Sequence, residues 1–185
     1  MAENGTVALT RDQILKLLPH GSIAMLVQGA IVTVEDDGGK ISVTARMATW
    51  PMREAGIEEA HFPTKPVVRG TDILEALFQA AAMCFHEELG ERLAYPGSVD
   101  NLRWRRKCHP DERIDLCAEV TRRRGDVFRF KIEALVGDEV ACSGEFTGVL
   151  DKKPPVEAPA QTEPAAPPSV HISAGVPGLA APSIG

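Results

Sequence analysis

One segment, residues 71–89, constrains the fold more than any other. Thr71–Leu89 (TDILEALFQAAAMCFHEEL) has neither proline nor glycine, and apolar side chains fall on nearly every face of its first four turns. A helix that is apolar all round is a buried helix. At ~1.5 Å per residue this one would span about 28 Å, roughly the width of a small domain. We therefore expect one long central helix that the rest of the chain must cover.

The segments that can cover this helix alternate apolar and polar residues, as β-strands with one buried face do. Residues 24–35 and 40–48 flank the turn sequence Asp36-Asp37-Gly38-Gly39 and predict a hairpin. Four more alternating segments follow the helix, and the short turns between them imply antiparallel neighbours. Only one helix can cover the apolar face of these strands, so we predict an α+β fold in which a curved antiparallel sheet of about six strands wraps around it. The four later segments are Val99–Arg106, Ile114–Arg122, Val127–Leu135 and Glu139–Val149.

The C-terminal end differs in composition from the rest of the chain. Eight of the 14 prolines lie between Pro154 and Pro182, with only two charged residues among them, and such a segment is too poor in large apolar side chains to pack. We predict a flexible N-terminus at residues 1–9, one folded domain at 10–150 and a disordered tail rich in proline and alanine at 151–185. Within the domain, Thr10 starts a short helix that Pro19 ends, and a proline-containing loop precedes the long helix.

Charge and cysteine content exclude several classes of function. The net charge is −6, of which Glu157 and Glu163 in the tail supply two, so nucleic acid is not the expected partner. The four cysteines form no C-x-x-C pair, which predicts reduced, mostly buried thiols in a cytoplasmic protein and no metal site. No run of 18 apolar residues is present, so no membrane span is expected.

Glu75 is a carboxylate inside the most apolar stretch of the chain. Burying an ionised carboxylate without partners is costly, so Glu75 should either pair with another group or stay protonated. It is therefore a candidate catalytic residue. The structural alternative is that Asp72 and Glu75, which have the spacing of a capping box, only cap the helix.

His61 lies in a loop of rigid residues that leads through Gly70 into the same helix. An imidazole beside a desolvated carboxyl group makes an acid/base pair that works near neutral pH. The amides of the first helical turn add partial positive charge where an oxyanion can be held. A lone histidine in such a loop is usually structural, but its combination with Glu75 favours a catalytic site.

These residues follow the pattern of a known family. The stretch His61-Phe62-Pro63-x-x-Pro66-x-x-x-Gly70-x-x-x-x-Glu75-Ala76-x-x-Gln79 resembles the signature of the FabZ-type 3-hydroxyacyl-[acyl-carrier-protein] dehydratases, members of the hot-dog superfamily. Leu18–His20 and Val99–Arg106 also resemble the family's segments, so the likeness covers roughly residues 10–150. It implies a hot-dog fold and a homodimer, which can assemble further, with each active site built from the histidine of one subunit and the glutamate of the other.

The resemblance also implies the chemistry and the role of each residue. The substrate would be a 3-hydroxyacyl thioester on the phosphopantetheine of acyl-carrier protein, in fatty-acid or related lipid or polyketide synthesis, and no cofactor would be needed. His61 would remove the α-proton, and protonated Glu75 would protonate the leaving hydroxyl to give a trans-2-enoyl thioester. Gly70 would bind the thioester carbonyl through its amide, Gln79 would orient Glu75, and Phe62 would contact the substrate.

Three positions depart from the family's pattern, where Ala60, Thr64 and Arg69 replace two glycines and a proline. Arg69 is the most unusual, because a cation at a helix N-terminus is disfavoured unless an anion neutralises it. Either Asp72 neutralises it, or Arg69 meets an anionic part of the ligand and belongs to the substrate-binding residues. These departures leave the acyl-chain preference open.

Two basic clusters, Arg103–Lys107 and Arg122–Arg124, stand out from this acidic chain. An acyl-carrier protein is acidic, so a local basic patch would steer it. Solvated strand ends are an equally good interpretation, whereas RNA binding through Trp104 fits poorly with the negative charge of the domain. The candidate docking residues are Arg103, Arg105, Arg106 and Lys107.

Two alternatives to dehydration stay open. A hot-dog thioesterase would use the acidic residue of the central helix to activate water, although that chemistry does not need the loop residue His61. A catalytically silent hot-dog module would bind acyl carriers or hold an assembly together, with the tail as its tether. The products separate the three functions, because they are an enoyl thioester, a free acid or nothing.

Overall fold

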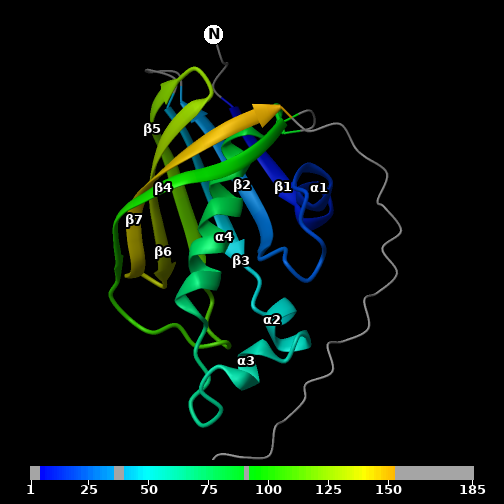
Figure 1. Ribbon diagram of the computed structural model, residues 1–185, viewed down its shortest axis with the longest axis vertical. Helices are drawn as coiled ribbons and strands as arrows, with labels where there is room; N and C mark the ends of the chain where they lie inside the picture. The colour runs from blue at the N-terminus through cyan, green and yellow to red at the C-terminus, as the bar shows by residue number, and fades with distance from the viewer. Residues whose placement is uncertain (1–4, 36–39, 90–91, 153–185) are drawn as a thin grey trace, which may run out of the picture. The chain divides into compact units, whose positions relative to one another are not determined.

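The computed structural model describes residues 5–35, 40–89 and 92–152. In these residues a single antiparallel sheet curls around the helix α4 (Gly70–Ala82), as Figure 1 shows. The predicted arrangement of a sheet wrapped around one helix is confirmed, with seven strands in place of about six. The strands are β1 (Gly5–Thr10), β2 (Val27–Glu35), β3 (Lys40–Met47), β4 (Arg92–Trp104), β5 (Asp115–Arg124), β6 (Val127–Val136) and β7 (Glu139–Lys152).

The core lies between α4 and the concave face of the sheet. The strands bury alternate residues, as period-2 side-chain geometry requires, so that Phe128, Phe130 and Ile132 of β6 are all buried. On the helix, Leu77 and Ala80 are fully buried. The sheet order is β1-β2-β3-β5-β6-β7-β4, which places the two hairpins β2–β3 and β5–β6 next to each other.

The smaller helices give one confirmation and one correction. Helix α1 (Arg11–Leu17) starts as predicted after Thr10, whose side chain accepts a hydrogen bond from the Gln13 amide in a capping box. The segment predicted as a loop instead contains α2 (Trp50–Glu54), with a proline in its first turn, and α3 (Ile57–Ala60). A proline in the first helical turn costs no hydrogen bond, which is why it did not prevent a helix here.

Several predicted boundaries differ from the structure, and the largest difference is at β4, which runs from Arg92 to Trp104 and not from Val99 to Arg106. Residues 5–9, expected to be flexible, belong to β1, which pairs with β2 along its whole length. The central helix is shorter than expected, because α4 gives way to the 3₁₀ turn η1 (Met83–Phe85). Strand β7 runs two residues beyond the predicted end of the domain, to Lys152. The predicted turn at 36–39 and the tail from residue 153 lie outside the described residues.

Strand β4 forms one edge of the sheet and, within the described chain, has β7 as its only strand neighbour. Its apolar side chains are unusually exposed: Tyr95 is 48% exposed, Val99 38% and Trp104 50%. A long edge strand of this kind presents backbone groups that can pair with another chain.

None of the helices in the described ranges is long and apolar enough to cross a membrane.

Candidate active site

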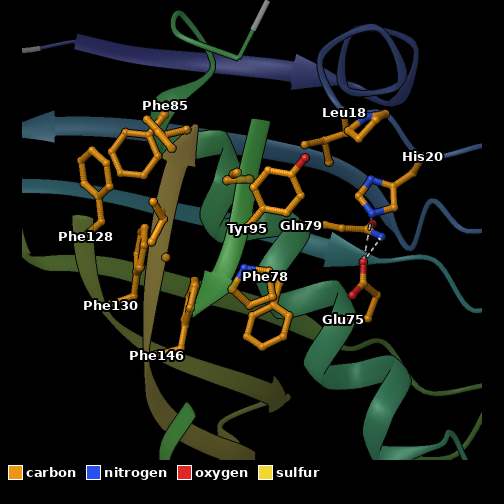
Figure 2. Close-up of a pocket in the computed structure, with 17 residues that line it drawn as sticks. Leu18, His20, Glu75, Phe78, Gln79, Phe85, Tyr95, Phe128, Phe130 and Phe146 are labelled. Carbon is orange, nitrogen blue, oxygen red and sulfur yellow. Dashed lines mark hydrogen bonds and ion pairs between the residues drawn. The ribbon is translucent and has the colours of Figure 1, made fainter. Parts of the chain in front are cut away.

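A cavity of about 210 Å³, here called the chamber, lies between α4 and the strands β4, β6 and β7. Figure 2 shows that its two ends differ in character. His20, Glu75 and Gln79 meet at one end, where dashed lines mark their contacts, and Phe85 and Phe128 lie at the other. The chamber thus joins one polar end to an apolar body.

The walls of the chamber are mainly apolar, and several of them are aromatic rings. The rings of Phe130 and Phe146 stack with centroids 4.5 Å apart and an interplanar angle of 6°. Gly148 of β7 also lines the chamber, and a Cβ atom there would come within 3.2 Å of the Phe146 ring and 3.3 Å of the Phe130 ring. Apolar walls with a few converging polar groups are typical of a ligand site. The phenylalanines that line the chamber are Phe78, Phe85, Phe128, Phe130 and Phe146.

Glu75 projects from α4 into the polar end of the chamber and is half-buried. Its Oε1 lies 3.1 Å from Nε2 of His20 and accepts a hydrogen bond from Nε2 of Gln79 at 2.9 Å. The hydrogen bond with His20 lowers the pKa of Glu75 below its ordinary value, and Gln79 adds to this lowering, while partial burial opposes it. We expected Glu75 either to pair with another group or to stay protonated. In a single chain it is paired, with His20 and Gln79.

The capping-box interpretation of Asp72 and Glu75 is wrong. Helix α4 begins at Gly70, and Arg69, at the N-cap position, makes no side-chain cap bond. Asp72 accepts two hydrogen bonds from Arg69, and Glu75 reaches toward His20. Neither carboxylate is used for capping, so Glu75 is left as a candidate functional group.

Gln79 is buried one turn after Glu75, and its amide is fixed on both sides. Its Oε1 accepts a hydrogen bond from the backbone N–H of Leu26 at 2.8 Å, and its Nε2 donates to the carbonyl of Ala24 at 2.8 Å. These two backbone groups precede β2 and determine which way round the amide sits. Nε2 must therefore face Glu75, and the predicted contact between the two side chains is present.

His20 is the residue of this site that the sequence argument left without a partner. It lies between α1 and β2 and is far from Glu75 in the sequence, so no helical or strand spacing connects the two. The available signal was the segment Leu18–His20, which resembles the family's pattern. Leu18 and Pro19 line the chamber as well, so the whole segment belongs to the site.

His61 lies in a second, more open cavity of about 730 Å³, here called the His61 groove. The ring of Phe62 lies beside the imidazole, with centroids 4.4 Å apart and the two planes tilted by 33°. Phe62 has a φ of 60° and is 60% exposed, and a bulky residue in this left-handed region costs about 1–3 kcal/mol. Lys107 and Trp104 line the same groove, so it combines aromatic and basic side chains around an imidazole.

Within one chain, His61 and Glu75 do not line the same cavity. The groove holds His61 together with Gly70, the first residue of α4, whereas Glu75 opens into the chamber. Glu75 is five residues after Gly70 in α4, so the two residues lie about 140° apart around the helix axis and face different sides. The prediction that these two groups meet at one helix start is therefore not met inside a single chain.

Gly70 is packed directly beneath the indole of Trp104. A Cβ atom at position 70 would lie 2.7 Å from Nε1 and 3.0 Å from Cε2 of Trp104. Real Cβ contacts are not this short, so the ring can sit on the start of α4 only because residue 70 has no side chain. The last residue of β4 and the first residue of α4 are thereby in direct contact.

We expect Gly70→Ala to destabilise the protein by about 1–3 kcal/mol, because the added methyl group forces the rigid indole to move. Urea unfolding followed by circular dichroism measures the effect. Gly21→Ala is the matched control, since a Cβ atom there would meet nothing within 4 Å. The same Gly70→Ala change should destabilise a Trp104→Ala protein much less, because the indole is then absent. Equal losses of unfolding free energy with and without the indole would contradict this explanation.

Arg69 is neutralised by its own helix. Its Nε and one terminal nitrogen each donate to Asp72 at 2.7 Å, and these bonds raise the pKa of Arg69. A helix N-terminus disfavours a cation, and the two parallel hydrogen bonds to the Asp72 carboxylate neutralise the charge of Arg69 there. Arg69 lines a small recess beside His61 and not the chamber. The first of its two interpretations, neutralisation by Asp72, is therefore supported, and its role as a substrate-binding residue stays a prediction.

The predicted docking residues divide into engaged and available side chains. Arg106 donates to Glu112 at 2.6 Å and lies 3.6 Å from Glu139, so its charge is largely compensated. Arg105 donates to the hydroxyl of Ser143. Arg103 is exposed and bonds only a neighbouring carbonyl among the contacts described, and Lys107 is exposed at the His61 groove.

The second basic cluster lies elsewhere on the sheet. Arg123 stacks over Phe128, with its guanidinium 4.7 Å from the ring centroid, and pairs with Glu88. Arg122 and Arg124 line a surface hollow together with Arg129. Only part of this cluster is therefore free to meet a partner.

A family model described as a FabA-like domain matches residues 18–145. The chain belongs to the FabA-like family. The matched region contains the chamber residues His20 and Glu75 as well as His61 of the groove.

Curated relatives agree with this membership, and a solved structure shares the fold. The FabA-like chain is 37% identical over 145 residues to the 3-hydroxyacyl-[acyl-carrier-protein] dehydratase FabZ of Bacillus cereus (strain AH820). The matched residues make up 77% of this chain and 96% of the relative. It is 36% identical over 139 residues to the protein of the same name from Acidovorax sp. (strain JS42), covering 72% and 92%. The Dehydratase Heterocomplex ApeI:P from Xenorhabdus doucetiae shares its fold, with a TM-score of 0.56 at 14% identity over 76% of this chain and 91% of that one. The predicted hot-dog fold is confirmed.

Proposed function

We propose that this chain dehydrates a 3-hydroxyacyl thioester, carried on acyl-carrier protein, to the trans-2-enoyl thioester. The observation that carries the proposal is the chamber, in which the carboxyl group of Glu75, held by two hydrogen-bonding partners, closes one end of an aromatic cavity. Such a cavity suits a substrate with a hydrocarbon tail and a reactive polar head. The names of the FabZ relatives support this choice of reaction.

The reaction uses one base, one acid and one oxyanion site. His61 takes the α-proton as the C–H bond breaks, and negative charge develops on the thioester oxygen. The amide of Gly70, at the positive end of α4, stabilises that charge. Glu75 gives its proton to the C3 hydroxyl as the C–O bond breaks, so the products are the enoyl thioester and water. Before the next turnover His61 must lose the proton that it has taken and Glu75 must regain one, and no cofactor takes part.

The active site is shared between two copies of the chain in a homodimer. His61 and Glu75 line different cavities of one chain, and a second chain can bring a His61 to each Glu75. The free edge of β4, with its exposed Tyr95 and Trp104, supports this assembly, because an edge strand pairs readily with its own copy. The exposed, strained Phe62 beside His61 gives further support, since an interface would cover it.

The carrier approaches at the basic rim of the His61 groove. Lys107 lines this groove, and Arg103 and Arg105 precede it on the same segment with exposed side chains. Their positive charge attracts an acidic carrier and the phosphate of its phosphopantetheine arm. Arg106 is a weaker candidate, because Glu112 and Glu139 already compensate it. The cytoplasmic location expected from the cysteines stays a prediction.

The aromatic end of the chamber should limit the length of the acyl chain. Phe85 of η1 packs against Phe128, with centroids 3.9 Å apart, at the end away from Glu75. We expect Phe85→Leu to shift the preference, measured as the ratio of kcat/KM values across a substrate series, toward longer chains by about tenfold, because one or two methylene groups gain space. Ile132→Val, a core change outside the chamber lining, is the control. An unchanged ratio would mean that another surface sets the length.

The proposal is tested by analysing the products of the purified full chain. Carrier-bound 3-hydroxyacyl thioesters of graded chain length are incubated with the protein, and the acyl products are identified by mass spectrometry. The expected product is the enoyl thioester, 18 mass units lighter than the substrate by loss of one water, as the bond changes of dehydration require. A free acid would indicate a thioesterase, and unchanged substrate a binding module, and either result would overturn the proposal.

A further inference from the structure

His20 contacts Glu75 but has no part in the acid/base chemistry proposed for His61 and Glu75. Glu75 must carry a proton when the C3 hydroxyl leaves. Its hydrogen bond with His20 nevertheless lowers its pKa below the ordinary value, and a carboxyl group of this kind is ionised near neutral pH. The site therefore needs a source for the proton that Glu75 delivers.

Three of the described residues that line the chamber can titrate. They are His20, from the segment between α1 and β2, Glu75 from α4, and Tyr95 from β4. A tyrosine hydroxyl ordinarily loses its proton only near pH 10. A histidine ordinarily titrates near pH 6.5. Of these three groups, His20 is the one that can exchange a proton with Glu75, because its Nε2 lies 3.1 Å from Oε1 of Glu75.

The contacts of Gln79 define the path for this exchange. Because Leu26 and Ala24 fix its amide, Nε2 of Gln79 always faces Oε1 of Glu75 as a donor. Nε2 of His20 meets the same oxygen at 3.1 Å. A single oxygen of Glu75 is thus held between an amide that cannot titrate and an imidazole that can.

The other nitrogen of His20 leaves the ring free to change its role. Nδ1 is buried and has no hydrogen-bond partner among the described residues. A partner at one ring nitrogen normally determines which nitrogen of a histidine carries the hydrogen. Since no such partner fixes His20, its Nε2 can donate to a carboxylate or accept from a carboxylic acid.

We propose that His20 is a positioning residue that stores a proton for Glu75 and passes it across the Nε2–Oε1 hydrogen bond when the acyl chain fills the chamber. This inference rests on the dehydration proposed above. Water stabilises the imidazolium and the carboxylate while the chamber is open, and an acyl chain displaces that water. Desolvation disfavours both charges, so the neutral pair forms. One proton moves from nitrogen to oxygen, and no other bond changes.

The test is His20→Gln, which keeps an N–H donor near Oε1 of Glu75 but removes the titrating imidazole. The proton must then reside on Glu75 alone, whose ordinary pKa is about 2 units below that of histidine. We expect kcat at pH 7 to fall about 100-fold, with KM changed less than threefold, and the alkaline limb of the kcat profile to move about 2 units lower. His86→Gln, which replaces a histidine outside the chamber lining, should leave the profile unchanged.

Two outcomes of this experiment would overturn the inference. A His20→Gln variant with the wild-type profile would mean that His20 is not needed. A fall in kcat by the same factor at every pH would mean that the ring only shapes the site. Lowering the pH should instead restore much of the activity of His20→Gln relative to the parent chain.

A second measurement does not depend on activity and separates this inference from the proposed function. The imidazole of His20 is titrated by NMR in the full chain and in Glu75→Gln. If the pair is coupled, the two NMR titrations should differ, because an anionic neighbour favours an imidazolium. If the two titrations coincide, the pair is not coupled and the inference fails, whether or not the chain dehydrates its substrate. If they differ but the chain makes no enoyl product, the proposed function fails alone.

Discussion

Replacing Glu75 by glutamine should lower kcat for dehydration by about 10²–10⁴-fold, the range that a positioned general acid contributes. The oxygen of a glutamine at this position can still accept the hydrogen bonds that Oε1 receives from Gln79 and His20. The geometry of the chamber is therefore retained, while the proton for the leaving hydroxyl is lost. Steady-state rates with a carrier-bound 3-hydroxyacyl thioester measure the loss.

Folding must be separated from chemistry in this experiment. Circular dichroism and thermal unfolding should show Glu75→Gln to be folded like the parent chain, since no buried charge is left unpaired by the change. Glu139→Gln, at an exposed residue with a long contact to Arg106, is the control and should keep the parent rate. A folded Glu75→Gln protein with the parent kcat would show that the acid lies elsewhere.

The second large effect is a recovery of activity by mixing two inactive variants. His61→Ala and Glu75→Gln should each lose most activity alone. In a randomly mixed homodimer population half of the dimers contain one chain of each kind, and one of their two shared sites has both intact residues. Co-expression of the two variants should therefore restore about one quarter of the parent activity.

The mixing experiment distinguishes shared sites from sites contained in one chain. If His61 and Glu75 of the same chain act together, every site in the mixture carries one lesion and no activity returns. Co-expressing His61→Ala with the double variant His61→Ala and Glu75→Gln is the matched control, because no His61 is present in it. Recovery in that control would show that His61 is not the base.

The fold could be predicted because local patterns and one global constraint agree. The turn residues and the period-2 alternation define the hairpins, and the apolar helix at Thr71–Leu89 requires a sheet that curves around it. Strand β1 escaped prediction because a six-residue edge strand has little alternation of its own and depends on pairing with β2. Its mostly exposed side chains give no pattern to detect.

The site could be predicted only in part, because its contacts are long-range. Gln79 was assigned to Glu75 correctly, since one helical turn separates them. The contact between Glu75 and His20 joins segments on either side of the hairpin β2–β3, and a capping box at Asp72 was an equally good local use for the carboxylate. Burial alone predicted that Glu75 would either pair or stay protonated, whereas the direction of its pKa shift depends on a neighbour that only the fold brings close.

Gly148 gives the chamber a property that no side chain supplies. The residue lies in β7 against the rings of Phe130 and Phe146. Part of the chamber is therefore open because residue 148 has no side chain. A Cβ atom there would press on both rings, whereas His20, Glu75 and Gln79 lie together at the polar end of the chamber. If the proposed dehydration is right, substrate range and acid/base chemistry depend on separate positions, and a single change in the sheet would narrow the range of substrates without altering the acid/base residues.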